Sequence, residues 1–480
     1  MIKKAIGWYK NCSLPLKASF WFLISNVVYK CVSMLTVPIF TRMLTTAEMG
    51  TVSVFNSWMS IVSIVATLQI TAGVFNKAMI KYEEDKDGYT STILILESCI
   101  TVILFLIFCA FKSFVETISG LSFTLIIMMF IDIFTGSAVS IWSARQRFDY
   151  RYRSVVAYSI ISNIVATGLS IIFILLFPSE KVLAKIAGLT VVRLVGGSVI
   201  FLLLIRKGKK VVNLPYWKYS VNYNLPLIPH YLSQMVLNQS DRLMIDNICG
   251  KAYAGIYSVA CQLALVTQMI ITSLHGVLMP WAFKSIKSGN AKVIGKRTIQ
   301  LELFVGGACL LFSLFAPEAL YIFGGAEYMK AVNVIPPVCM SVLFITIYTF
   351  FGFIEFYYEK TKLIMVASCI VAVANIALNA IFIPIFGFVA AAYTTLACYI
   401  LYSLSHYWFM KKICKDNGMS NPFNGKLIFA ISIVFTALSI LVSFVYNNIW
   451  LRYVLIAIIL MVGFWLLIIK KNYRLILGKK

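Results

Sequence analysis

The sequence predicts an all-α integral membrane protein. Of its 480 residues, 60% are hydrophobic and 12% are charged, whereas a soluble globular protein has about 45 to 50% apolar and about 25% charged residues. Fourteen apolar stretches have roughly the length of about 20 residues that a helix needs to cross a bilayer. Lysine and arginine are distributed unevenly between the connections of these stretches, as the positive-inside rule requires of a membrane protein.

The predicted spans follow one another with short connections. They lie at approximately residues 18–38, 50–73, 89–111, 119–142, 154–177, 183–205, 221–246, 252–276, 298–316, 332–356, 363–384, 386–409, 427–446 and 450–469. The opening MIKK is followed by an apolar run without a small-residue cleavage site. We therefore expect the first span to remain in the mature protein, because a signal peptide would be cleaved at such a site.

The basic residues predict that both ends of the chain are cytoplasmic. With a cytoplasmic N-terminus, 32 of the 42 lysines and arginines fall in inside segments and seven in outside segments, Lys181 and Lys185 among the seven. The other three, Lys30, Arg193 and Arg242, lie within spans. This asymmetry predicts an even number of spans. It also accounts for the net charge of +24 without nucleic acid as a partner.

A weak internal repeat divides the chain. Gly50 and the TVSV after it resemble Gly255 and the IYSV after it, an offset of 205 residues. An offset equal to six spans predicts two six-helix lobes related by a parallel pseudo-two-fold axis along the membrane normal. We predict lobes at residues 1–213 and 214–410, followed by an added pair of C-terminal helices at 411–480.

The seventh span, NYNLPLIPHYLSQMVLNQSDRLMID, contains two prolines. Pro226 and Pro229 each remove a backbone donor, so we expect the entry to this helix to be bent or partly unwound. Discontinuous helices at membrane depth are where transporters bind substrate and bend. We predict hinges at Pro226, Pro229 and, in the first span, Pro38.

Polar residues follow Pro229 at helical spacing. Gln234, Asn238 and Arg242 recur every four residues and so share one face of the helix. A charged side chain at the bilayer centre costs at least about 2.5 to 3.5 kcal/mol. We therefore expect this face to meet protein or water.

Five other spans also carry polar residues at helical spacing. Serine and threonine mediate contacts between membrane helices, so these faces are candidates either for packing or for the wall of a cavity. The residues are Ser19, Asn26, Lys30 and Ser33; Asn56, Ser60, Ser63 and Thr67; Asp132, Gly136, Ser140 and Ser143; Ser159, Asn163, Thr167 and Ser170; and Gln268, Thr272 and His275.

The cations within or beside the spans suggest an anionic substrate. Lys30, Arg193 and Arg242, with Arg42 at the rim, are predicted to converge on a central cavity. Arginine suits phosphate oxygens because its planar fork donates two hydrogen bonds at once. The predicted substrate-binding residues are these four cations with Asn56, Asn238 and Gln234.

Each of these cations has a structural alternative. Arg242 could pair with Asp246, four residues on, and Lys30 could extend along its span toward the membrane surface. Arg193 could pair with Glu97 or Asp132, and Gly196 and Gly197 beside it would let a second helix approach. The sequence leaves these alternatives open.

The sequence offers no pattern for catalysis or metal binding. Most of the eleven cysteines lie inside apolar runs and none forms a CxxC pair, so we expect neither a disulfide framework nor a metal site. The three histidines are isolated in sequence and are interpreted as structural groups. No connection carries a GxxxxGK[ST] motif, and nothing resembles a catalytic triad. We expect no cofactor and no enzymatic activity.

Three stretches resemble a known family. LTVPIFTRMLTTAEMGTVSVFNSW, NLPLIPHYLSQMVLNQSDRLMI and AYAGIYSVA are similar to the Wzx-type flippases of O-antigen and capsular polysaccharide repeat units. These form the polysaccharide transporter branch of the multidrug/oligosaccharidyl-lipid/polysaccharide exporter superfamily. The resemblance covers essentially the whole chain. The motif positions that carry over are Pro38, Arg42, Pro226, Pro229, Asp241 and Arg242.

The resemblance implies a function. Such a protein moves an undecaprenyl-pyrophosphate-linked oligosaccharide from the cytoplasmic to the outer leaflet of the bacterial inner membrane, by alternating access of its two lobes. Its partners would be the lipid-linked glycan, membrane lipid and, further along the pathway, a polysaccharide polymerase and a chain-length regulator. The transport could be coupled to H⁺ or Na⁺, and Glu97, Asp132 and Asp241 are the candidate coupling residues.

Two other functions remain as alternatives. A multidrug efflux antiporter of the same superfamily would need acidic groups for organic cations, whereas the first span here offers Lys30. A membrane glycan polymerase or ligase would act on the same lipid-linked sugars. Those enzymes typically expose a large outer loop, and the longest outside connection here, around residues 317–331, is short.

Overall fold

The computed structural model describes residues 14–468 and, in that range, its regular elements are helices. The chain divides into two compact units, with the boundary between Gly255 and Ile256. The predicted lobes at residues 1–213 and 214–410 are defined by the internal repeat of the sequence, whereas these two units are defined by their compactness. The lobes therefore stay a prediction.

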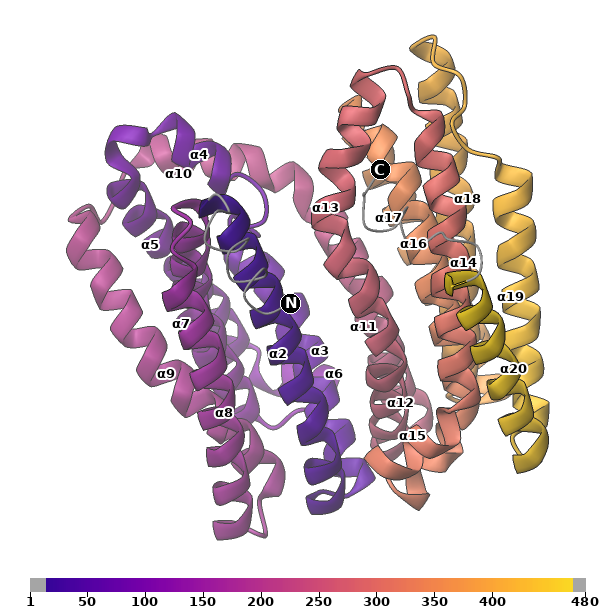
Figure 1. Ribbon diagram of the computed structural model, residues 1–480. Helices are drawn as coiled ribbons and strands as arrows, with labels where there is room; N and C mark the ends of the chain where they lie inside the picture. Colours follow the sequence, from indigo (N-terminus) through magenta and orange to yellow (C-terminus); the bar gives the residue numbers. More distant parts are fainter. Residues whose placement is uncertain (1–13, 469–480) are drawn as a thin grey trace, which may run out of the picture. The chain divides into compact units, whose positions relative to one another are not determined.

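The first unit is a bundle of long helices joined by short ones. In chain order these are α2 (Leu14–Met43), α3 (Thr46–Thr67), α4 (Phe75–Lys81), η1 (Glu83–Asp85), α5 (Lys86–Ala110), α6 (Lys112–Ser119), α7 (Phe123–Phe148), α8 (Tyr152–Leu176), α9 (Lys181–Gly208), α10 (Leu214–Asn224), η2 (Leu225–Leu227), α11 (Ile228–Cys249) and the start of α12 (Lys251–Ala264). Helix α9 packs against α5, α7 and α8, and α2 packs against α8 (Figure 1).

The second unit is also built of long helices joined by short ones. After the rest of α12 it contains η3 (Leu265–Thr267), α13 (Gln268–Lys287), α14 (Lys292–Leu314), α15 (Ala316–Phe323), η4 (Ala326–Val334), α16 (Ile335–Tyr357), α17 (Thr361–Phe386), α18 (Ala390–Asp416), α19 (Gly425–Val445) and α20 (Ile449–Ile468). Its centre is α16, which packs against α14, α18 and α19.

Each predicted span coincides with one helix or with a run of consecutive helices. Within the described residues, nine of these are long and apolar enough to cross a membrane. The structure thus supports a multi-pass, all-helical membrane protein, while the count of fourteen and the cytoplasmic placement of both ends stay predictions. The longest predicted outside connection, residues 317–331, is itself largely helical, in α15 and η4.

Local sequence signals explain where the helices begin. Thr45 precedes α3, and its hydroxyl accepts a hydrogen bond of 3.2 Å from the Glu48 backbone N–H. The Glu48 carboxylate accepts one of 2.7 Å from the Thr45 N–H in return. This reciprocal capping satisfies two backbone donors that a helix start leaves without intrahelical partners.

The predicted interruption of the seventh span is confirmed. Helix α10 ends at Asn224, the 3₁₀ helix η2 contains Pro226, and α11 begins with Pro229 in its first turn. A proline cannot donate the next α-helical hydrogen bond, so the chain changes helix type here. Pro38, by contrast, lies inside the continuous helix α2. Whether these three prolines act as hinges stays a prediction.

Gly50 and Gly255, the glycines that define the repeat, pack against each other within the first unit. A Cβ on Gly50 would lie 1.8 Å from the carbonyl oxygen of Lys251, and one on Gly255 would lie 2.2 Å from that of Thr46. Thr46 and Lys251 are themselves 205 residues apart, so the two contacts are equivalent under the repeat offset. Only glycine allows the backbones to come this close.

We expect Gly50→Ala to destabilise the protein because the added methyl group would collide with backbone atoms that cannot rotate away. The cost of such overpacking is about 1 to 3 kcal/mol or more, and Gly255→Ala should behave alike. The measurement is the thermal unfolding midpoint of the purified protein in detergent.

The matched control is Gly307→Ala, inside α14, where an added Cβ would meet nothing within 4 Å. This substitution should leave the unfolding midpoint unchanged or raise it slightly, because alanine favours a helix over glycine. Equal midpoints for Gly50→Ala and Gly307→Ala would contradict the packing argument.

Candidate functional site

The first unit contains a cavity of about 930 Å³. Its wall is formed mainly by α2, α3, α7, α8 and α9. A cavity of this size is within the range of small-molecule binding sites.

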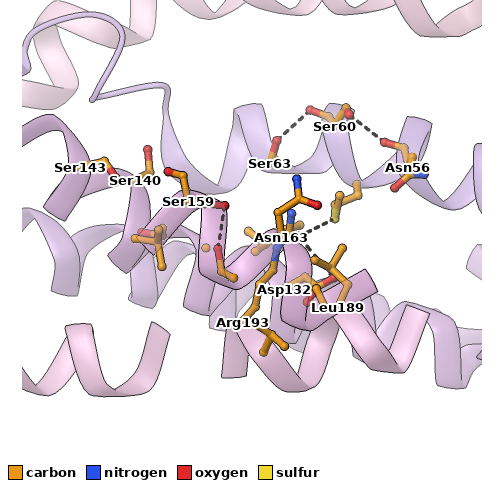
Figure 2. A pocket seen from close by; sticks show the side chains of 18 of the residues that line it. Asn56, Ser60, Ser63, Asp132, Ser140, Ser143, Ser159, Asn163, Leu189 and Arg193 are labelled. Atoms are coloured by element: carbon orange, nitrogen blue, oxygen red, sulfur yellow. Dashed lines mark hydrogen bonds and ion pairs between the residues drawn. The ribbon is translucent and has the colours of Figure 1, made fainter. Parts of the chain in front are cut away.

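Three of the predicted polar faces line this cavity together. They come from α3, α7 and α8, and Figure 2 shows several of their side chains around one space. Packing between helices alone would not place all three faces on one open volume. The lining residues from these faces are Asn56, Ser60, Ser63 and Thr67; Asp132, Gly136, Ser140 and Ser143; and Ser159, Asn163, Thr167 and Ser170.

The other predicted polar faces are described only in part. Ser33 of α2 lines the cavity. The side chains of Asn26 and Lys30 in α2, and those of Thr272 and His275 in α13, lie outside the described residues. The predicted role of Lys30 therefore stays a prediction.

Hydroxyl groups along α3 are oriented by their own helix. Ser60 donates to the Asn56 carbonyl at 2.7 Å, and Ser63 donates to the Ser60 carbonyl at 2.9 Å (Figure 2). Thr67 donates to the Ser63 carbonyl at 2.8 Å. A hydroxyl oxygen that has used its proton keeps lone pairs to accept with. This wall can therefore accept hydrogen bonds from the hydroxyls of a polar ligand.

Arg193 of α9 provides a cation in the cavity wall. Its guanidinium nitrogen lies 3.4 Å from a carboxylate oxygen of Asp132 on α7 (Figure 2). The Asp132 side chain is completely buried, whereas that of Arg193 is 31% exposed. The structural alternative of pairing with Asp132 is thus realised, and the exposed part of the guanidinium remains accessible to a ligand.

Glycines in α9 allow this ion pair to form. A Cβ on Gly197 would lie 2.7 Å from the Thr135 carbonyl oxygen of α7, and one on Gly196 would lie 2.9 Å from the Tyr158 hydroxyl of α8. The expectation that a second helix approaches α9 at these glycines is confirmed. Close helix contact brings Arg193 within reach of Asp132.

Two further basic residues line the cavity, and neither is among the predicted substrate-binding residues. Lys185 of α9 was counted with the outside segments, yet it lines the cavity, as does Arg147 near the end of α7. Lys185 and Arg193 are eight residues apart and therefore lie on nearly the same helix face. That spacing was the signal from which Lys185 could have been found.

The structure does not gather all the predicted substrate-binding residues. Of those whose side chains are described, Arg193 and Asn56 line this cavity, whereas the others are not among its lining residues. The Arg42 guanidinium donates to the Pro38 carbonyl at 2.9 Å. The residues outside the lining are Arg42, Arg242, Asn238 and Gln234.

The structural alternative in which Arg242 pairs with Asp246 is not realised. The Arg242 guanidinium instead donates to the Asn238 carbonyl and, at 3.3 Å, to the Gln239 side-chain oxygen. The distance from Arg242 to a carboxylate exceeds 4 Å throughout the described part of the chain. The Asn238 backbone carbonyl and the Gln239 side chain, one turn earlier, lie within its reach, which explains the different partners.

The three candidate coupling residues are all buried. Glu97 of α5 accepts a short hydrogen bond from Ser137, which itself lines the cavity. Asp132 holds Arg193, and Asp241 of α11 is 4% exposed. Their part in ion coupling stays a prediction.

Comparison with known sequences finds relatives along the chain. A family described as polysaccharide biosynthesis protein matches residues 16–286. An uncharacterized membrane protein of Haemophilus influenzae is 24% identical over 366 residues, which is 74% of this chain and 86% of that protein. The capsular polysaccharide biosynthesis protein CapF of Staphylococcus aureus is 23% identical over 176 residues, 36% of this chain and 44% of that protein.

Comparison with solved structures defines the fold. The lipid II flippase MurJ in an inward closed conformation has a TM-score of 0.64 at 15% identity, covering 90% of this chain and all of that one. A multidrug resistance MATE family transporter of the MOP superfamily, in an inward-facing conformation, has a TM-score of 0.58 at 11% identity, covering 84% and 98%. At these identities, the likeness concerns the fold.

A third similar structure bears on the charge of the site. It is a MOP superfamily transporter from Pyrococcus furiosus, described as having a binding pocket of reverse polarity that suggests a different function. Its TM-score is 0.57 at 13% identity, covering 83% of this chain and 96% of that one.

We expect cysteines placed at Ser60 and Ser159 to react with a membrane-impermeant, hydrophilic thiol reagent, because both positions line the cavity. The experiment uses a variant whose own cysteines are replaced, and labelling is measured by the mass of the purified protein. Val165→Cys is the matched control on α8. Val165 is 45% exposed but does not line the cavity, so lipid should exclude the reagent there. Equal labelling of Ser159→Cys and Val165→Cys would contradict a water-filled cavity.

Proposed function

The chain belongs to the polysaccharide biosynthesis protein family, and on that premise we propose that it is a flippase for a lipid-linked glycan. The proposed substrate is an oligosaccharide joined through pyrophosphate to undecaprenol, carried from the cytoplasmic to the outer leaflet of the bacterial inner membrane. The fold shared with the MOP superfamily transporters supports transport by alternating access.

The observation that carries this proposal is Arg193 in a cavity lined with hydroxyl groups. The exposed part of the guanidinium offers hydrogen bonds to phosphate oxygens. The serine, threonine and asparagine side chains around it offer acceptors and donors to sugar hydroxyls. The two properties together match a ligand with a phosphate group and a glycan.

The charge of the cavity argues against drug efflux. Among the side chains that the structure describes, the charged ones that line it are the three basic residues Arg147, Lys185 and Arg193 and the acidic Asp132. An excess of positive charge in a low-dielectric site repels organic cations and attracts anions. The multidrug alternative is therefore the weaker one for this chain.

A polymerase or ligase is also less consistent with the structure. The residues between spans 9 and 10, the longest outside connection, form the short helices α15 and η4. They leave little chain for a catalytic domain on that side. The proposed partners of the flippase are instead a separate polymerase and a chain-length regulator, which would use its product.

For the transport cycle we propose roles for the prolines and the buried acids. Pro226 and Pro229 lie where the helix type changes, which favours a hinge there. Energy coupling to H⁺ or Na⁺ would use Glu97, Asp132 or Asp241, since an ionisable group at membrane depth is often functional.

We expect Arg193→Ala to abolish most of the surface glycan in a strain whose own copy is deleted. Loss of a charge-assisted hydrogen bond contributes about 1.5 to 3 kcal/mol, or roughly a ten- to hundred-fold effect. Arg193→Lys should restore part of the activity, because lysine keeps the charge but not the fork. The measurements are surface glycan by immunoblot and membrane abundance of each variant.

The matched control is Arg206→Ala, an exposed arginine in the last turn of the same helix. It should support normal glycan display. Deletion of the gene should also make lipid-linked glycan accumulate, detectable in membrane extracts as a cytoplasm-facing pool. Normal surface glycan with Arg193→Ala at normal abundance would remove Arg193 from the site. Unpolymerised units on the outer face of the deletion strain would instead favour the polymerase alternative.

A further inference from the structure

Helix α9 presents two cations to the cavity at different depths. Lys185, Leu189 and Arg193 recur every four residues, and all three line the cavity. At a rise of about 1.5 Å per residue, the backbone positions of Lys185 and Arg193 are about 12 Å apart along the helix. In the predicted topology α9 starts at the outer side, so Lys185 is the outer of the two.

Neighbouring methionines on α3 show that the charged ends of these side chains are also separated. The Lys185 ammonium lies 3.4 Å from the sulfur of Met49, and the Arg193 guanidinium lies 3.7 Å from that of Met59. Met49 and Met59 are ten residues apart, about 15 Å along an α-helix. One pyrophosphate group, whose phosphorus atoms share a bridging oxygen, cannot contact both cations at once.

The two cations differ in their partners. Arg193 has the carboxylate of Asp132, whereas Lys185 lies 4.3 Å from the centre of the Phe40 ring and beside Met49. No carboxylate lies within 4 Å of Lys185 among the described residues. The side chains that are not described include no aspartate or glutamate. The positive charge of Lys185 is thus not neutralised by an acidic side chain of this chain.

We propose that Lys185 is a second anion-binding station, which receives the phosphate group of the substrate after Arg193 has released it. This inference rests on the proposed function for the identity of the anion. A partly buried lysine without a counter-ion is costly, and a bound phosphate oxygen would offset that cost. Phe40 and Met49 contribute weaker, non-ionic contacts that hold the ammonium in place.

Asp132 gives the transfer a direction. An anion that binds Arg193 competes with the Asp132 carboxylate for the same guanidinium. Once the anion moves to Lys185, Asp132 pairs with Arg193 again and opposes its return. Lys185 has no such internal competitor, and its compact ammonium lacks the two-pronged geometry that would hold phosphate rigidly. Arg193 therefore acts as the first station and Lys185 as the one from which the substrate leaves.

The first test measures binding of radiolabelled inorganic pyrophosphate to the purified full-length protein. The measurement is made in an Arg193→Ala background, where Lys185 is the remaining station. There we expect Lys185→Ala to weaken binding about tenfold, as loss of a charge-assisted contact should, while Lys185→Arg retains it. Lys181→Ala in the same background is the matched control, because Lys181 lies one turn earlier on α9 and does not line the cavity. Equal affinity of the Arg193→Ala protein with and without Lys185→Ala would overturn the proposal.

The second test uses Asp132→Asn, which removes the competitor of Arg193 and keeps the shape of the side chain. We expect it to bind pyrophosphate about tenfold more tightly and yet to support less surface glycan, because the substrate is retained at the first station. A purely structural role for Asp132 would lower both binding and display. Weaker binding in this variant would overturn the assigned role of Asp132.

Surface glycan in the deletion strain separates this inference from the proposed function. We expect Lys185→Ala to lose most of the glycan at normal membrane abundance, and Lys181→Ala to restore it. Lys185→Arg should restore it only in part, because its planar fork holds phosphate more firmly. Normal display with Lys185→Ala beside defective display with Arg193→Ala would overturn the second station and leave the proposed function intact. Failure of the wild-type gene itself to restore glycan would overturn the proposed function, while the binding measurements would still decide whether Lys185 holds an anion.

Discussion

A buried charge must be compensated, and this constraint shapes both units of the protein. Arg193 is compensated by Asp132 in the first unit. In the second unit the Arg452 guanidinium lies 2.6 Å from the Glu318 carboxylate, and His406 lies 2.8 Å from that of Glu355. In each case a long helix supplies one partner and a neighbouring element supplies the other. The ion pairs thereby also specify which helices lie together.

Polar side chains pair with one another in part of the second unit and line a cavity in the first. In the second unit, Asn379 accepts a short hydrogen bond from Thr394, and Asn375 donates to Thr395 at 3.1 Å. Polar side chains there are buried against one another between α17 and α18. In the first unit, the polar faces of α3, α7 and α8 instead surround an open cavity. Polar groups that face a cavity keep hydrogen-bonding capacity for a ligand, which is why the first unit carries the candidate site.

Small residues decide how closely the helices approach. Gly197 lets α9 touch the backbone of α7, and Gly50 and Gly255 allow a contact that repeats itself under the offset of 205 residues. The first contact places Arg193 beside Asp132. The second contact joins two positions that are equivalent in the internal repeat of the sequence. Both contacts require a glycine, which has no Cβ atom. The candidate site and the packing of the helices therefore depend on the same feature.

The sequence by itself determined the helical class, the approximate positions of the long helices and the faces that carry polar residues. Hydropathy and helical periodicity are local properties, and lipid penalises every unsatisfied polar group in the same way. These features can therefore be predicted without knowing which helices are neighbours. The interruption at Pro226 and Pro229 was predictable for the same reason, since a proline acts on its own turn of helix.

Only the tertiary structure decided which charged residues meet. From the sequence alone, Arg42, Arg193 and Arg242 were all predicted to bind substrate, and Lys185 was placed in an outside segment. In the structure, Arg193 and Lys185 line the cavity. The direction of a side chain depends on how its helix is rotated about its own axis, and that rotation is set by packing at contacts such as Gly197 with Thr135. Such contacts join residues far apart in the chain, so no local pattern reveals them.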